Sequence, residues 1–514
     1  MAHPKVDQTL RLQKQKRDLN HQVSLLFAEW ILNSYLATQG VSKEPNQFFQ
    51  RNLIMSSPNV IFILTDDQGP WAAGCYGNSE IRTPNIDRIA ATGVRFDNFF
   101  VTIPVCSPSR ASFLTGRIPS QHGVHDWIRE GNTGPDAASY LQDEICYTDV
   151  LAKHGWTCGL SGKWHLGNST LTQHGFSHWF AYEKGGGQYN DATMVRNGEL
   201  VVEPGYVTNV ITDDALQFID THAQDDNPFY LSVHYTAPHS PWKGHPQDIV
   251  DSYDDCPFES CPQEDPHPWA GSLSGNLGDR ESLKGYFAAV TAMDLDVGRI
   301  LDKIEDKNIR DNTLVVFTSD NGFSCGHHGF WGKGNGTRPL NMYENSVKVP
   351  FVATHPGVIP EGSVQSAMVS GYDFMPTLLD YLNLPLPQDR NYPGQSFLAT
   401  LKGQEDTGRD NIIIYDEYGT TRMIRTEDWK YIHRYPDGPN ELYDLIKDPD
   451  ERTNLVEDSA QANRIKEMKS QMETWFATYT VPDKDGRDYM INGGGQMRPV
   501  GRNWEDGREP FALR

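Results

Sequence analysis

The chain has 514 residues, 38% of them hydrophobic, and a formal net charge of −23. This length exceeds that of one ordinary domain and predicts a large domain with a smaller companion. The acidic balance argues against nucleic acid and anionic membrane surfaces as partners, because both are bound mainly through Lys and Arg. The sequence contains no apolar run of about 18 to 20 residues, so no transmembrane helix is expected. An anionic substrate would therefore need positive charge that is concentrated at one site.

Residues 1–55 are predicted to form an N-terminal helical extension. Apolar residues recur there at helical spacing and predict an amphipathic helix that packs on the body or joins an oligomer: Leu25, Leu26, Trp30, Ile31 and Tyr35. The polar start "MAHPKVDQ" is a poor secretory signal, so we expect a cytoplasmic protein. A periplasmic or secreted location would follow only if the true start differs, for example at Met55.

Cysteine usage agrees with a reducing compartment, because seven cysteines are few and uneven for this length. Cys256 and Cys261 are the one pair whose spacing leaves a bridge open. Asn168 and Asn335 begin N-x-S/T sequons. The second lies where we expect the active site, so a glycan there would obstruct it.

Residues 56–405 are predicted to form the large domain. An apolar, β-branched strand at 59–65 precedes a helix at 83–93, and a helix at 207–223 precedes a strand at 229–235. A long helix at 280–308 then leads into a strand at 313–319. Alternation of this kind predicts an α/β fold with a large, mixed, mostly parallel sheet sandwiched by helices.

Residues 406–514 have a different character and are predicted to form a C-terminal α+β subdomain and tail. Four short strand patterns, "IIIYDE", "RMIRT", "WKYIHRY" and "ELYDL", are separated by turn residues. A helical segment at 460–479 follows them. The subdomain is therefore expected to be built on a small antiparallel sheet.

Acidic side chains follow two of the predicted core strands. Asp66 and Asp67 come after the first strand in "ILTDDQG", and Asp320 and Asn321 follow a later one in "FTSDNGF". Ligands of open α/β sheets bind at the carboxyl ends of strands, and an all-oxygen set suits Ca²⁺ or Mg²⁺. Turn formation and helix capping are the alternative explanation for such residues.

The stretch "VCSPSRASFLTGR" places Cys106 at the predicted start of a helix. By itself this cysteine could be a thiol nucleophile, a metal ligand, half of a disulfide or a buried apolar residue. Free N–H groups at a helix start, together with Arg110 one turn along, favour an electropositive site for an anion.

Further basic groups follow strands in loops that are rich in Gly, Trp and Pro. "GLSGKWHLG" carries Lys163 and His165, "TAPHSPW" carries His239, and "HHGFWGKGNG" carries His328 and Lys333. Functional residues favour loops held by a rigid scaffold, although a single loop His or Lys is most often a solvated surface residue. His234 alternates with apolar neighbours inside a strand and is interpreted as structural.

The pattern C-x-P-S-R followed by A-S-F-L-T-G-R resembles the signature of the type I sulfatases, members of the alkaline-phosphatase-like superfamily. "TDDQG", "GKWHLG", "TAPHSPW", "SDNG" and "GKG" also occur in that family's order. The resemblance covers about residues 58–480. It implies the alkaline-phosphatase-like sulfatase fold and hydrolysis of an O-sulfate ester.

The resemblance also implies a cofactor and a modification. A formylglycine-generating enzyme would oxidise Cys106 to formylglycine, an aldehyde whose hydrate is a geminal diol. One Ca²⁺ would be held by residue 106 together with Asp66, Asp67, Asp320 and Asn321. One hydroxyl of the diol would attack sulfur to give a sulfo-enzyme intermediate, and the other would eject sulfate.

The remaining motif residues receive roles by the same resemblance. Arg110 would hold the diol. Lys163 and Lys333 would contact the sulfate oxygens and stabilise the transition state. His239 would be the general acid for the leaving alcohol, and His165 the base that triggers elimination.

The substrate is expected to be a sulfated carbohydrate, because Trp127 and Trp242 could stack on sugar faces. Residues near the motifs that could line the cleft are Asp126, Trp127, Arg129 and His328. The loops at 183–191 and 251–269 could form its rim. The alternatives are a phosphonate monoester or phosphodiester hydrolase of the same superfamily, and a non-catalytic protein that binds sulfated glycans.

Overall fold

The computed structural model describes residues 57–404, 413–501 and 509–512. The predicted N-terminal extension and the predicted domain boundary near residue 405 lie outside these residues. Within the described ranges, no helix is long and apolar enough to cross a membrane.

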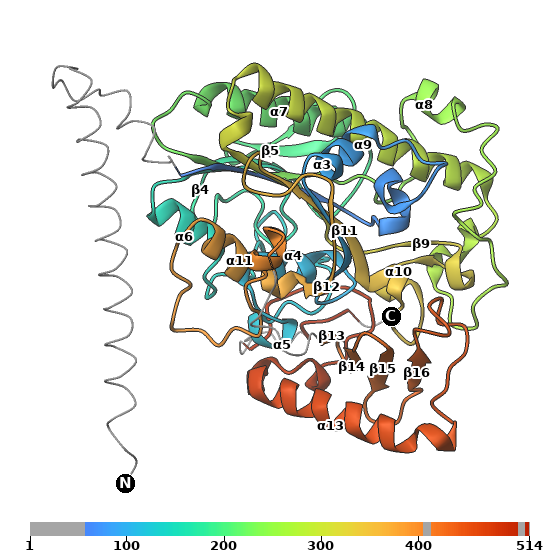
Figure 1. Ribbon diagram of the computed structural model, residues 1–514. Coiled ribbons are helices and arrows are strands. Elements are labelled where there is room, and N and C mark those ends of the chain that lie inside the picture. Colours follow the sequence, from blue (N-terminus) through green and yellow to red (C-terminus); the bar gives the residue numbers. More distant parts are fainter. Residues whose placement is uncertain (1–56, 405–412, 502–508, 513–514) are drawn as a thin grey trace, which may run out of the picture. The chain divides into compact units, whose positions relative to one another are not determined.

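The predicted central sheet is present and has ten strands, mostly parallel (Figure 1). In spatial order they are β12 (Ser363–Ser370), β2 (Val94–Phe100), β11 (Lys348–Thr354), β8 (Thr313–Ser319), β1 (Asn59–Thr65), β7 (Phe229–His234), β3 (Thr157–Lys163), β4 (Phe176–Tyr182), β5 (Thr193–Arg196) and β6 (Glu199–Val202). The central run β8-β1-β7-β3 is parallel throughout, whereas β11, β5 and β6 run antiparallel to their neighbours. This arrangement confirms the α/β prediction.

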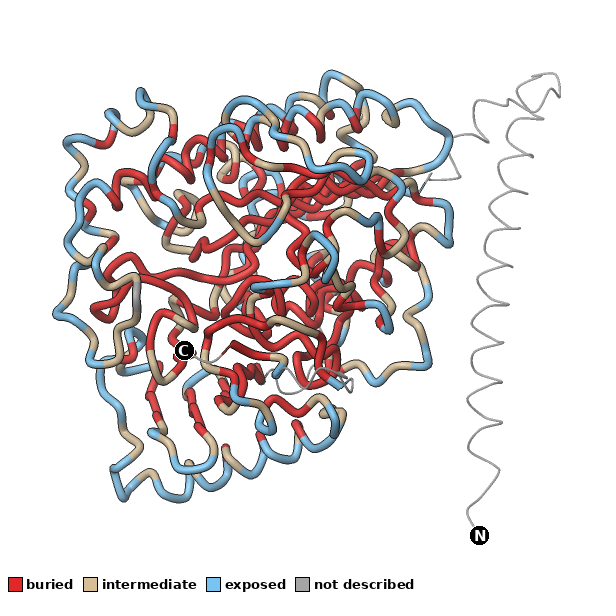
Figure 2. The backbone as a smooth tube through the Cα atoms, turned by 180° about the vertical axis from the view of Figure 1, so that it is seen from behind, coloured by how far each residue is buried: buried red, intermediate tan, exposed pale blue. Residues whose placement is uncertain are grey.

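Strand β1 shows why the sheet is covered on both faces. Its residues alternate between two hydrophobic clusters, with Phe62 in one and Ile61 and Ile63 in the other. The first cluster includes residues of α4 (Cys106–Thr115), α6 (Tyr147–Lys153) and α11 (Phe374–Tyr381). The second includes residues of α3 (Pro84–Ala91), α7 (Val207–His222) and α9 (Arg280–Asp306). A strand that is apolar on both faces thus accounts for helices on both (Figures 1 and 2).

The C-terminal part forms a separate four-stranded antiparallel sheet, as predicted. Its strands are β13 (Ile414–Tyr418), β14 (Thr421–Arg425), β15 (Trp429–Arg434) and β16 (Glu441–Asp444), and α13 (Ala462–Tyr479) packs on it. Buried Lys430 in β15 forms 2.7 Å ion pairs with Glu344 and Glu451. Glu344 begins the short helix α10 (Glu344–Val347), so this cluster ties the small sheet to the larger body.

The described fold also contains several short elements. They are the helices α5 (Pro119–His122), α8 (Gln247–Asp251) and α12 (Leu398–Leu401), and a two-stranded hairpin of β9 (Ser324–Cys325) and β10 (Trp331–Gly332). All seven cysteines are free, so the bridge that spacing left open between Cys256 and Cys261 is not formed.

Candidate active site

Register in the sheet brings the two acidic clusters together. Thr65 of β1 lies opposite Ser319 of β8 in a parallel pair, so the next residues, Asp66 and Asp320, emerge side by side. Carboxylate oxygens of Asp66, Asp67 and Asp320 lie within 4.8 Å of one another, and all three residues are buried. Two motifs about 250 residues apart in the chain thus form one cluster, as predicted.

The donor atoms of this cluster fit a hard divalent cation. Three of its oxygens are buried and have no hydrogen-bond partner in the structure: Oδ1 of Asp66, Oδ1 of Asp320 and Oδ1 of Asn321. Buried polar oxygens are normally satisfied, so three bare ones on residues of the two acidic motifs fit the needs of a bound cation. Asp67 adopts a left-handed backbone conformation (φ 70°), which turns the chain sharply at the strand end.

Two buried lysines neutralise the carboxylates. Lys163, at the end of β3, forms an ion pair with Asp66. Lys333, just after β10, forms one with Asp67 and lies 3.7 Å from Asp66. Burial alone would raise the pKa of Asp66, but nearby positive charges, first that of Lys163, hold it well below its usual range. Burial would lower the pKa of Lys333, but Asp67 and neighbouring groups raise it well above its usual value.

Cys106 is the first residue of α4, as predicted, and is 3% exposed. Lys333 Nζ donates a 3.1 Å hydrogen bond to its Sγ. The loop after Lys333 lies against the segment before Cys106, since Gly334 N–H donates to the Pro104 carbonyl (3.1 Å) and a Cβ on Gly334 would lie 2.5 Å from Pro104 Cγ. Burial raises the pKa of the Cys106 thiol despite the two lysines, so the unmodified side chain is not an activated thiolate.

Arg110 is buried and orders the centre. Its Nε donates to Asp320 Oδ2 at 2.8 Å, and its Nη1 donates to the Lys163 carbonyl at 3.0 Å. Its Nη2 is buried and has no partner in the structure. Arg110 therefore holds one acidic cluster in place and keeps a free donor group.

The two predicted acid–base histidines present different nitrogens. His165 donates from Nε2 to the Ile128 carbonyl (2.9 Å), which leaves the lone pair of Nδ1 without a hydrogen-bond partner. His239 donates from Nδ1 to the Ser240 carbonyl (2.8 Å), and its Nε2 lies 3.9 Å from Asp67. A ring nitrogen of His239, an oxygen of Asp66 and the Cys106 sulfur lie within 4.8 Å of one another. Burial lowers the pKa of both rings, although Asp66 and Asp67 oppose this at His239.

His234, interpreted as structural, is buried in β7 and donates from Nδ1 to the Lys163 carbonyl at 3.1 Å. It therefore supports the end of β3.

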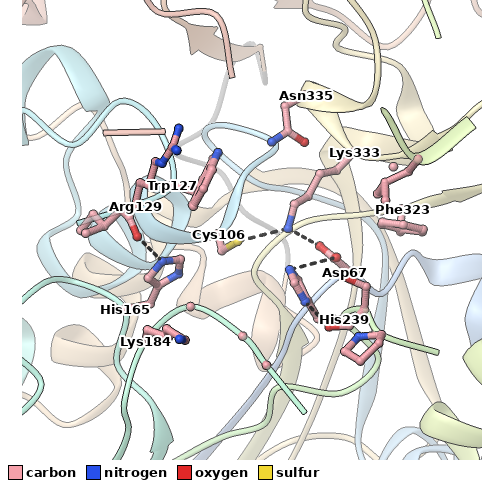
Figure 3. Close-up of a pocket in the computed structure, with 18 of the residues that line it drawn as sticks. Asp67, Cys106, Trp127, Arg129, His165, Lys184, His239, Phe323, Lys333 and Asn335 are labelled. Atoms are coloured by element: carbon pink, nitrogen blue, oxygen red, sulfur yellow. Dashed lines mark hydrogen bonds and ion pairs between the residues drawn. The ribbon is translucent and has the colours of Figure 1, made fainter. Parts of the chain in front are cut away.

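A pocket of about 540 Å³ opens over this centre (Figure 3). Its inner wall includes Asp67, Cys106, His165, His239 and Lys333. Trp127, Arg129 and Trp242, which were predicted to contact substrate, also line it. The structure thus places Cys106, His165, His239 and Lys333 around one cavity, whereas the predicted catalytic residues Arg110 and Lys163 are buried and do not line it.

Two predicted substrate contacts do not line the pocket. Asp126 is buried and accepts hydrogen bonds from Tyr418 Oη (2.5 Å) and Gly495 N–H (3.0 Å). His328 is also buried; its ring stacks on Tyr343 at 4.1 Å, and its Nδ1 lies 2.8 Å from Arg452 Nη1. Both side chains are buried away from the pocket. The prediction that they contact substrate was based on their closeness to the motifs in the sequence, and it was wrong.

The wall that carries Trp127 and Arg129 is supported by the C-terminal segment 493–496. Gln496 N–H donates to the Trp127 carbonyl, and Arg129 N–H donates to the Gln496 carbonyl, both at 2.8 Å. Trp127 Nε1 donates to the Gly493 carbonyl at 3.2 Å. The hydrogen bond from Gly495 N–H to Asp126 adds a further contact between this segment and the wall, so Asp126 helps to position the wall.

Sequence reasoning missed several lining residues, among them Asn132, Leu273 and Phe323. Asn335 carries the second sequon, and its place in the pocket agrees with the expectation that a glycan there would obstruct the site. Of the two predicted rim loops, 183–191 contributes Lys184 and three glycines, whereas 251–269 contributes no lining residue. The glycines make room, since a Cβ on Gly185 would lie 2.2 Å from the His165 ring.

Comparison with known proteins identifies the architecture. Residues 58–384 match the family model described as Sulfatase, and residues 326–477 match the model described as N-sulphoglucosamine sulphohydrolase, C-terminal. An N-acetylglucosamine-6-O-sulfatase of Bacteroides thetaiotaomicron is 28% identical, with 84% of this chain and 89% of that protein covered. An N-acetylgalactosamine-6-sulfatase of Canis lupus familiaris is 30% identical, with 72% of this chain and 70% of that protein covered.

A solved structure of a protein in complex with its substrate, D-glucosamine-2-N,6-O-disulfate, has the same fold. Its TM-score is 0.71 at 27% identity, and the match covers 84% of this chain and all of the other. Together with the family model, which spans more than half of the chain, these matches show that the protein belongs to the sulfatase family of the alkaline-phosphatase-like superfamily and is a sulfatase.

Proposed function

We propose that this sulfatase cleaves an O-sulfate ester on a sulfated carbohydrate, using formylglycine made from Cys106 by a formylglycine-generating enzyme, and one Ca²⁺. The observation that carries the proposal is the set of three bare, buried oxygens beside residue 106 at the start of α4. The relatives named for sulfated amino sugars support a carbohydrate substrate.

The cation would be held by Asp66, Asp67, Asp320 and Asn321, with residue 106 beside them. When bound, it would supply positive charge that polarises the sulfate and lowers the pKa of a neighbouring hydroxyl. The matured side chain would supply a hydroxyl nucleophile that the buried thiol of Cys106 does not provide, because burial raises the pKa of that thiol.

The other side chains bind the sulfate group and move protons. Lys333 Nζ already reaches residue 106 at 3.1 Å, so it can stabilise charge on sulfate oxygens bound there. His239 faces the same point through Nε2 and is placed to donate a proton to the leaving sugar oxygen. The bare Nδ1 of His165 is placed to accept a proton from residue 106.

Substrate-side features favour a sugar. The pocket of about 540 Å³ has the size of a small-ligand site and carries the aromatic rings of Trp127, Trp242 and Phe323. Trp127 is half-buried and lines the same pocket as Lys333.

The decisive experiment has two parts. Mass spectrometry of the tryptic peptide 96–110 from protein co-expressed with a formylglycine-generating enzyme should show an aldehyde at residue 106. The same protein should release sulfate from N-acetylglucosamine 6-O-sulfate, and it should hydrolyse an aryl sulfate faster than a phosphonate monoester. Active protein that carries only unmodified cysteine, or faster phosphonate turnover, would contradict the proposal.

A further inference from the structure

Two cations at the pocket rim have no role in the chemistry described above. Arg129 and Lys184 line the pocket, are exposed, and come from separate loops. Figure 3 shows both on the side where His165 lies, whereas Lys333, Asp67 and His239 lie on the opposite side of Cys106. They therefore form a second group of positive charge in the same cavity.

The first group of cations is already neutralised by carboxylates, but the second is not. Lys163 and Lys333 form ion pairs with Asp66 and Asp67. Within the described part of the chain, the guanidinium of Arg129 has only a 3.5 Å contact with the Gly494 carbonyl. Lys184 Nζ lies 3.9 Å from its neighbour Glu183, and the Lys184 side chain is exposed. Ion pairs between exposed side chains provide little interaction energy, so Glu183 neutralises Lys184 only weakly.

The lining of the pocket offers no compensating charge. Among the described lining residues, Asp67 is the one carboxylate, and its Oδ1 is taken up by Lys333 and Asn321. In a chain with a net charge of −23, uncompensated positive charge at one cavity rim focuses the field on an anion. Neutral sugar hydroxyls can form hydrogen bonds with neutral donors and acceptors, and Asn132 and Asn335 provide these in the pocket.

The backbone of this rim is ordered in a way that suits binding. Arg129 follows Trp127 on the wall that Gln496 supports through two 2.8 Å hydrogen bonds. Lys184 precedes the glycine run 185–187, which lines the pocket without side chains next to the rings of His165 and His239. A sugar ring lying against Trp127 would thus have its substituents on the side of the pocket that carries Arg129 and Lys184.

We propose that Arg129 and Lys184 form a second anion subsite, and that the preferred substrate is a saccharide with a second anionic group besides the sulfate ester that is cleaved. This inference rests on the proposed carbohydrate sulfatase function. Sulfate and carboxylate share the chemistry that a guanidinium and an ammonium recognise, so either can be the second group.

Binding to the Cys106→Ala variant tests the subsite without turnover. Calorimetry would compare N-acetylglucosamine 6-O-sulfate with D-glucosamine-2-N,6-O-disulfate and with a 6-O-sulfated disaccharide that contains a hexuronate. We expect at least one of the doubly anionic saccharides to bind about tenfold more tightly than the first. The more tightly bound one identifies the second group as sulfate or carboxylate, and added salt should weaken the preference.

Charge-removing variants locate the effect. Arg129→Gln together with Lys184→Gln should abolish the preference, and each single variant should reduce it. Lys243→Gln is the matched control, because Lys243 is exposed beside Trp242 but does not line the pocket. Equal binding of all three saccharides, no measurable binding of either doubly anionic one, or a preference that survives in the double variant would overturn the subsite. Failure of the mature wild-type protein to release sulfate from any of them would instead overturn the proposed function.

Discussion

The inner and outer halves of the pocket are built in opposite ways. The inner half takes its charged groups from residues that follow the carboxyl ends of adjacent parallel strands, from α4 and, in the case of Lys333, from the turn after β10, and nearly all of them are buried and paired. The outer half is formed by loops whose cations, Arg129 and Lys184, are exposed and lack strong partners. A rigid sheet thus fixes the chemistry, and loops attached to it are free to set the substrate.

The sharpest test of the inner half is removal of its nucleophile. Cys106→Ala should reduce sulfatase turnover by on the order of 10⁵-fold, because no other side chain replaces the modified residue. The fold should persist with a loss of roughly 1 kcal/mol, since only one buried atom is removed. Aryl sulfate kinetics and calorimetric unfolding would measure both. A large drop in thermal stability would show that Cys106 serves chiefly as a packing residue.

The next test concerns the cation that the bare oxygens indicate. Ca²⁺ at about 100 times its dissociation constant should stabilise the wild-type protein by about 2.7 kcal/mol, and a chelator should reverse this shift. Asp320→Asn should lose most of that shift and at least about 10³-fold in turnover, because Asp320 supplies one of the three bare oxygens. Thermal unfolding with and without Ca²⁺ gives the comparison. If Ca²⁺ stabilised Asp320→Asn as much as the wild type, the ion would have to bind at another site.

The inner half could be predicted from the sequence because local patterns determine it. A buried strand followed directly by acidic residues, as at Asp66 and Asp320, places them at the ligand-binding edge of a parallel sheet. The same holds for Cys106, whose helix start is marked by Pro and good helix formers.

The outer half could not be predicted, because its geometry depends on distant contacts. Asp126 looks like a pocket residue until its partner Gly495, 369 residues away, turns the side chain inward. His328 sits in a left-handed conformation (φ 57°) that no local pattern indicated, and this brings its ring onto Tyr343. The four-stranded sheet could be predicted because turn residues separate its strands in the sequence. No sequence pattern indicated that the segment 493–496 supports Trp127.

Substrates with different leaving groups can distinguish the roles of His239 and His165. His239→Ala should reduce kcat/KM for a sugar sulfate by about 10²- to 10⁴-fold, because an alkoxide leaves poorly without a proton. An aryl sulfate with an acidic phenol should lose much less. His165→Ala should affect both substrates alike if it acts on residue 106. Equal losses for the two substrates in His239→Ala would remove it from the role of general acid.

A smaller effect is expected where the two halves meet the C-terminal segment. Asp126→Asn keeps the shape of the side chain, but its single amide oxygen cannot accept from both Tyr418 Oη and Gly495 N–H, as the two carboxylate oxygens do. We expect KM for a sulfated saccharide to rise about tenfold while kcat changes little, because the wall with Trp127 and Arg129 loosens. Steady-state kinetics on the saccharide would show the split. A fall in kcat with KM unchanged would indicate that Asp126 acts on the inner half.

The smallest effect concerns His328, which belongs to neither half and should act on stability alone. Burial, reinforced by Arg452, lowers its pKa to about 2, so the folded protein keeps this ring neutral at pH 4 to 6. The unfolded chain binds a proton there below about pH 6.5, so the contribution of His328 to stability is complete above that pH and is lost as pH falls. His328→Gln should therefore flatten the decline by about 1.4 kcal/mol per pH unit, measured by urea unfolding at pH 6 and pH 5. Turnover at pH 7 should stay near that of the wild type, because His328 does not line the pocket; a clear loss in folded protein would return it to the substrate site.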